Sequence, residues 1–134
     1  MDSEQPVTIM VVDQHEEVCE SLARSLDRLP GLKVVAHTTN LLRAAELARE
    51  SPPDLIIADF TWGVAARPDI LRWFASVSPG TRFVMYSSYY INGEREAFQA
   101  AGASCCLLKG MSIQDLGAEL SKTIATYRQT KSPA

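Results

Sequence analysis

The sequence lacks several features that would mark whole classes of protein. No apolar run approaches the roughly 18 residues that suggest a membrane-spanning helix. No cluster of lysine and arginine marks a nucleic-acid surface, and the formal net charge of the 134 residues is −3. The first residues are polar and acidic, unlike a secretory signal peptide. We therefore expect a cytoplasmic protein that binds neither a membrane nor, through this domain, nucleic acid.

Cysteine is scarce, and the local motifs of several enzyme classes are missing. The three cysteines are Cys19, Cys105 and Cys106, and an odd number with an adjacent pair does not suit a disulfide framework. Cys105 and Cys106 lie in an apolar run, which favours small core residues over a redox pair. No CxxC motif, glycine-rich phosphate loop or Ser-His-Asp order is present, and neither His15 nor His37 has a partner at catalytic spacing.

What is present is a hydrophobic pattern that alternates between the periods of strand and helix. The strand-like runs cover residues 7–12, 32–37, 54–60, 81–88 and 104–109. The helix-like segments cover residues 18–29, 40–50, 69–77, 93–103 and the residues from 112 onward. Five successive βα units predict an α/β protein of the flavodoxin-like (βα)5 doubly wound type, with a parallel five-stranded sheet in the order 2-1-3-4-5 and helices on both faces. We expect one domain over residues 7–127, between an N-terminal tail, 1–6, and a C-terminal tail, 128–134.

Local signals add detail to this prediction. Asn40 and Ser112 are expected to cap the second and fifth helices. The segment 61–68 is expected to be a loop. The first helix should bury an apolar face with helical spacing. The residues predicted on that face are Val18, Leu22, Leu26 and Leu29.

Polar side chains end four of the five predicted strands. These residues are Asp13, Asp59, Ser87 and Lys109. Each alone has an ordinary explanation as a helix cap, a turn residue or a surface charge. Together, at the ligand-binding edge of a doubly wound sheet, they indicate phosphoryl chemistry. A carboxylate can form an aspartyl phosphate, a lysine and a hydroxyl can hold the added oxygens, and a second acid can hold Mg²⁺.

The chain resembles a response-regulator receiver domain of bacterial two-component signalling over nearly its whole length. "PDLIIAD" resembles the third strand of that family, and "AGASCCLLK" resembles its fifth strand. "DQH" stands where the NarL/FixJ-type branch commonly has Asp-Asp-His, and "LLKG" is similar to that branch as well.

The resemblance implies a role for each residue at the predicted site. Asp59 would accept a phosphoryl group from a histidine kinase or a phosphotransfer protein, with Lys109 as the ion-pair partner and Ser87 as the switching hydroxyl. Asp13, Asp59 and the backbone carbonyl of Thr61 would bind Mg²⁺. The domain would signal by a conformational switch, with self-catalysed phosphoryl transfer at Asp59 as its only chemistry. A homodimer is a further expected form.

Several positions depart from the family pattern. Gln14 replaces the second acid of the metal pair; its side-chain carbonyl could still bind the cation but brings no charge, so Mg²⁺ binding is expected to be weak or absent. Gly63 and Gly110 replace family prolines, and Cys106 replaces the switch aromatic on the fifth strand. An alternative is therefore a pseudo-receiver, a phosphorylation-independent module for protein interaction or dimerisation. A flavodoxin-like cofactor binder is a further alternative, although the acidic "DQHEE" would repel a phosphate.

Overall fold

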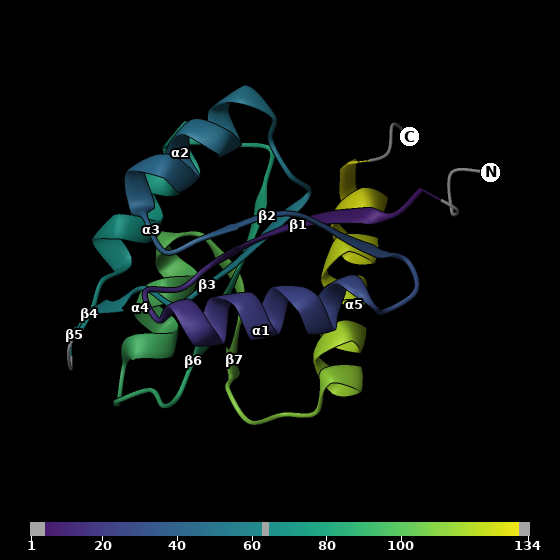
Figure 1. The fold of residues 1–134 in the computed structure, drawn as a ribbon. Helices are drawn as coiled ribbons and strands as arrows, with labels where there is room; N and C mark the ends of the chain where they lie inside the picture. The colour runs from purple at the N-terminus through teal and green to yellow at the C-terminus, as the bar shows by residue number, and fades with distance from the viewer. Residues whose placement is uncertain (1–4, 63–64, 132–134) are drawn as a thin grey trace.

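The computed structural model describes residues 5–62 and 65–131, and its main sheet has the predicted parallel order (Figure 1). The five strands are β1 (Val7–Val12), β2 (Leu32–Thr38), β3 (Leu55–Ala58), β6 (Arg82–Ser87) and β7 (Ala103–Leu108). Their order is β2-β1-β3-β6-β7. Because β4 and β5 pair only with each other, this is the predicted order 2-1-3-4-5, and the predicted fold class is confirmed.

Helices cover both faces of the sheet. They are α1 (Glu16–Asp27), α2 (Leu41–Glu50), α3 (Pro68–Val77), α4 (Glu94–Ala101) and α5 (Ile113–Lys131). Figure 1 shows α1 and α5 on one side and α2, α3 and α4 on the other. Strand β3 is buried along its length, and its side chains alternate between the two cores. This alternation explains why the strand is continuously apolar in sequence.

The two predicted helix caps are confirmed. The Asn40 side chain accepts a hydrogen bond from the backbone nitrogen of Arg43 at 2.9 Å. The Ser112 hydroxyl accepts one from the backbone nitrogen of Asp115 at 3.0 Å. Each bond satisfies a backbone donor that the first helical turn leaves without an intrahelical partner.

The predicted buried face of the first helix is confirmed at Leu26, and Leu22 and Leu29 pack against the same core, but Val18 does not belong to it. Cys19, Ala23 and Leu26 are the buried residues of α1, while Val18 is 37% exposed. The spacing of apolar residues gives the period of a helix but not its rotation against a sheet. Here the small side chains of Cys19 and Ala23 face the sheet and let the helix approach it closely.

Two boundaries also differ from the prediction. Part of the expected loop 61–68 forms a small antiparallel pair, β4 (Thr61–Trp62) with β5 (Ala65–Ala66), whereas Gly63 lies outside the described residues. Helix α5 continues to Lys131, beyond the expected end of the domain at residue 127, because each further helical residue adds one backbone hydrogen bond. Among the helices in the described ranges, none is both long and apolar enough to cross a bilayer.

Candidate functional site

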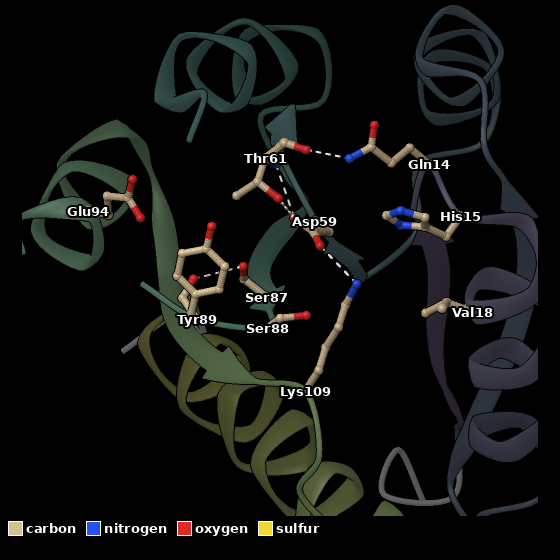
Figure 2. A pocket seen from close by; sticks show the side chains of 10 residues that line it. All are labelled: Gln14, His15, Val18, Asp59, Thr61, Ser87, Ser88, Tyr89, Glu94 and Lys109. Atoms are coloured by element: carbon tan, nitrogen blue, oxygen red, sulfur yellow. Dashed lines mark hydrogen bonds and ion pairs between the residues drawn. The ribbon is translucent and has the colours of Figure 1, made fainter. Parts of the chain in front are cut away.

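The carboxyl ends of the strands bring the four predicted polar residues to one edge of the sheet. Backbone hydrogen bonds continue the strand ladder as far as these residues, as between Asp59 N and Val12 O at 3.1 Å and between Lys109 N and Ser87 O at 2.8 Å. A cavity of about 300 Å³ opens at this edge, and Asp59, Ser87 and Lys109 line it (Figure 2). Asp13 is buried, with 2% of its surface exposed, and contacts the cavity residue Lys109.

Lys109 joins the two acids of the site. Its Nζ atom lies 2.8 Å from Asp13 Oδ2 and 2.8 Å from Asp59 Oδ2. Burial alone would lower the pKa of Lys109, but the hydrogen bonds to the two carboxylates outweigh burial and raise the pKa. Lys109 therefore stays positively charged and offsets one of the two buried negative charges.

Thr61 contacts Asp59 through atoms that the sequence did not single out. Its backbone nitrogen donates to Asp59 Oδ1 at 3.1 Å, and its hydroxyl donates to the same oxygen at 2.5 Å. Only the Thr61 carbonyl was predicted to take part in the site. The available signal was a threonine two residues after an aspartate, a spacing at which an aspartate side chain often accepts from the backbone.

Gln14 directs its amide nitrogen at the carbonyl predicted to bind metal. Gln14 Nε2 lies 2.5 Å from the backbone oxygen of Thr61 (Figure 2). A carbonyl oxygen can only accept a hydrogen bond, so the facing atom of Gln14 is the NH₂ group and not the side-chain oxygen. The amide bond thus links the loop after β1 to the segment after β3.

His15 is a site residue that sequence reasoning missed. Its backbone nitrogen donates to Asp13 Oδ1 at 2.9 Å, and its ring Nδ1 lies 3.3 Å from the same oxygen. The imidazole also lines the cavity. Because the contact comes from a neighbour two residues along the chain, no long-range spacing in the sequence could indicate it.

A divalent cation at this site would have to compete with protein donors for the oxygen atoms predicted to bind it. Both oxygens of Asp13, both oxygens of Asp59 and the Thr61 carbonyl all receive N–H or O–H groups of the protein. Within the described ranges, no group of three His, Cys, Asp or Glu side chains is placed to hold a metal ion. Mg²⁺ binds through oxygen lone pairs, and in this structure each of these oxygens already directs a lone pair at a protein donor.

Ser87 lines the cavity, but its hydroxyl is hydrogen-bonded to neither Asp13 nor Asp59. Its hydroxyl donates to the backbone oxygen of Tyr89 at 3.0 Å (Figure 2). The next residue, Tyr90, is anchored on strand β7, where its hydroxyl donates to Leu107 O at 2.9 Å. Cys106, at the position of the family's switch aromatic, is buried.

Comparison with known proteins gives the same family as the residues. The family model of the response regulator receiver domain matches residues 9–121. The nitrate/nitrite response regulator protein NarL of Escherichia coli K12 is 29% identical over 118 residues, which are 87% of this chain and 54% of NarL. The chain thus spans about half the length of this curated relative.

Solved structures agree with this assignment. A LuxR-family two-component response regulator from Aurantimonas sp. SI85-9A1 matches with a TM-score of 0.80 and 25% identity, covering 91% of this chain and 87% of that one. A CheY-like receiver domain protein from Methanospirillum hungatei JF-1, at 16% identity, matches in fold with a TM-score of 0.81 over 94% of this chain and 99% of that one. The predicted family is confirmed: the chain belongs to the response regulator receiver domain family, the signalling domain of two-component systems.

Proposed function

We propose that this domain accepts a phosphoryl group on Asp59 from a histidine kinase or a phosphotransfer protein and signals through a conformational switch. The observation that carries the proposal is the position of Lys109, 2.8 Å from both Asp13 and Asp59 in a cavity that Ser87 also lines. The cytoplasmic location expected from the sequence belongs to the same proposal.

In the proposed reaction, a carboxylate oxygen of Asp59 forms a bond to phosphorus and the phosphorus–nitrogen bond of the phosphohistidine breaks. The imidazole leaves with the electron pair of that bond and takes up a proton from water. Lys109 is poised to pair with the new phosphoryl oxygens because its ammonium group already contacts the acceptor. Ser87, in the same cavity, would donate its hydroxyl to another of these oxygens.

Divalent metal plays a weak part or none in this proposal. Thr61 O receives the Gln14 amide, and the carboxylates receive Lys109, His15 and Thr61. We assign the neutralisation of the acceptor to this chain's own donors, with Lys109 as the principal positive charge.

Treatment with a small phosphodonor tests this function. We expect wild-type protein to gain one phosphate that Asp59→Asn does not gain, because only a carboxylate forms the acyl phosphate. Asp115→Asn, the same acid-to-amide change at an exposed position in the first turn of α5, is the control and should still be labelled. The measurement is a phosphate-retarding gel, run with Mg²⁺ and again with a chelator. Wild-type protein that stays unlabelled in both conditions would refute phosphoryl acceptance.

A pseudo-receiver is the second candidate function, and the protein donors on the oxygens of Asp13, Asp59 and Thr61 favour it. A site already satisfied by Lys109, Gln14, His15 and Thr61 holds one conformation without phosphate. This candidate predicts that wild-type protein and Asp59→Asn form the same homodimer, with or without a phosphodonor. Sedimentation velocity would measure this, and dimerisation that depends on phosphate would exclude the pseudo-receiver.

A further inference from the structure

The loop between β6 and α4 carries three consecutive large side chains with different environments. Tyr89 is 53% exposed and Ile91 is 52% exposed, while Tyr90 between them is partly buried and packs against the core under α4. Of these three side chains, Tyr90 is therefore the one that supplies the loop's apolar contact with the core.

Tyr90 and Arg95 together fasten this loop to the edge strand β7. The Tyr90 hydroxyl donates to Leu107 O at 2.9 Å, and the Arg95 guanidinium donates to Cys106 O at 2.8 Å. The guanidinium carbon also lies 4.6 Å from the centre of the Tyr90 ring, within the range of a cation–π contact. The Phe98 ring packs edge-on against the tyrosine, with 6.4 Å between centroids. Two successive carbonyls of β7 thus bind side chains of the loop and of α4.

Cys106 belongs to the same apolar core that Tyr90 packs against. Its side chain is 6% exposed, and its sulfur lies 3.8 Å from the backbone oxygen of Arg95. Burial raises the pKa of Cys106 to about 11. The Cys105 side chain packs on the opposite face of the sheet, where its sulfur lies 3.8 Å from the Thr123 hydroxyl.

The hydroxyl of Ser87 connects this loop to the phosphoryl site. Ser87 Oγ donates to Tyr89 O at 3.0 Å (Figure 2). That carbonyl belongs to the peptide unit joining Tyr89 to Tyr90. A serine hydroxyl has one proton, so it cannot donate fully to Tyr89 O and to a phosphoryl oxygen on Asp59 at the same time. Turning toward the phosphoryl group therefore frees the peptide unit next to the docked ring.

We propose that Tyr90 is a positioning residue that reads the state of Ser87: its ring is docked on β7 while Ser87 holds the Tyr89 carbonyl, and it is released when Ser87 turns to a phosphoryl oxygen. The readout aromatic thus lies on the loop after β6, and the small Cys106 on β7 belongs to the core against which this ring packs. The trigger in this inference rests on the proposed phosphorylation of Asp59. The coupling between Ser87 and Tyr90 is a property of the unphosphorylated protein.

The coupling is tested by the rate at which a thiol reagent labels Cys106 in unphosphorylated protein with Cys19→Ser and Cys105→Ser. Release of Tyr90 uncovers this thiol, so Ser87→Ala and Tyr90→Phe should each raise the labelling rate about fivefold, as the loss of one neutral hydrogen bond shifts a two-state equilibrium. Tyr90→Phe keeps the ring and its contact with Arg95, so it isolates the hydroxyl. An unchanged rate in both variants overturns the proposal.

Matched controls separate release of Tyr90 from general loosening. Tyr89→Phe removes the same atom from the exposed neighbour and should leave the Cys106 rate unchanged. Protein that keeps only Cys19, which is 1% exposed between α1 and the sheet, reports opening of the other core. Its rate should not respond to Ser87→Ala or to Tyr90→Phe, and an equal rise there would assign the effect to instability and overturn the proposal.

A second arm adds the phosphodonor. Phosphorylation should raise the Cys106 rate in protein with Ser87 and leave it unchanged in Ser87→Ala, while a phosphate-retarding gel records the modification. Phosphate on Asp59 with no change in the Cys106 rate would overturn the proposed trigger. If the gel shows no phosphorylated protein, the proposed function is refuted. The labelling rates of the unphosphorylated variants would still test the coupling of Ser87 to Tyr90.

Discussion

Among single side chains, Gln14 changes the chemistry of the site most relative to the family pattern, which has an acid at this position. It brings a neutral amide to a position next to two buried acids, Asp13 and Asp59, and it binds the Thr61 carbonyl through its nitrogen. Two unit charges 4 Å apart interact by about 4 kcal/mol at an effective dielectric constant near 20, and solvent access reduces this value. The absence of one carboxylate therefore removes a large share of the attraction for a divalent cation.

Gln14→Asp should raise the affinity for Mg²⁺ or Mn²⁺ by about tenfold or more, since even part of that Coulomb energy exceeds the 1.4 kcal/mol of a tenfold change. Gln14→Asn is the matched control, because the asparagine side chain has the same length as aspartate but no charge. Isothermal titration calorimetry would measure both variants. Equal affinities of the two variants would mean that the protein donors on Asp13 and Asp59, and not the missing charge, exclude the metal.

Among the strands, the alignment of β1, β3 and β6 depends on a polar contact at the edge opposite the site. Asp54, just before β3, accepts from Thr8 N at 3.0 Å and from the Thr8 hydroxyl at 3.2 Å, and the same hydroxyl accepts from Asp54 N at 2.8 Å. The Asp54 carbonyl accepts from Arg82 N at 2.9 Å. These bonds fix the register that brings Asp13 and Asp59 level at the other end, because a shift of one residue would turn each side chain to the other face.

Thr8→Val should lower the free energy of unfolding by about 1–3 kcal/mol, because the change removes two partly buried hydrogen bonds and leaves the Asp54 backbone nitrogen without this acceptor. Urea denaturation followed by circular dichroism measures the change. The same substitution at the exposed Thr39 should stay within about 0.5 kcal/mol of the wild type. Similar values for the two variants would contradict the importance of the contact.

For the domain as a whole, several cysteine and tyrosine side chains should make the free energy of unfolding fall at alkaline pH. Burial raises the pKa of the thiols of Cys19, Cys105 and Cys106, the last to about 11. Burial likewise raises the pKa of the Tyr86 and Tyr90 hydroxyls. A group whose pKa is higher in the folded state binds its proton more tightly there, so its contribution to stability is complete below the unfolded pKa and is lost as pH rises toward the folded pKa.

We therefore expect the free energy of unfolding to fall as pH rises from about 8.5, the usual pKa of cysteine, toward about 11. Urea denaturation in reducing buffer at a series of pH values measures this slope. Cys106→Ala should flatten the slope, even though the loss of the side chain lowers the overall stability. A free energy that is constant or rising over this range would contradict the assignment.

The sequence was informative where a periodic pattern or the end of a strand sets the position of a residue. Five runs of apolar residues predicted the sheet and its order, because parallel strands need helical crossovers and right-handed connections leave few arrangements. Asp13, Asp59, Ser87 and Lys109 could be placed at one edge because the carboxyl ends of parallel strands meet there. The caps at Asn40 and Ser112 were predicted correctly because each depends on a hydrogen bond to a backbone nitrogen only three residues away.

The rotation of a helix and the orientation of a side chain depend on packing between segments far apart in the chain. Packing of α1 against the sheet buries Cys19 in place of Val18, although the apolar spacing allowed both. The amide nitrogen of Gln14 binds Thr61, 47 residues away in sequence, and the Tyr90 hydroxyl binds Leu107 on β7, 17 residues away. Local sequence patterns do not reach over such separations, so neither contact could be predicted. The residue types and the periodicity of the apolar residues thus established which groups meet at the sheet edge. Contacts between distant parts of the folded chain determined which atoms of those groups form hydrogen bonds with one another.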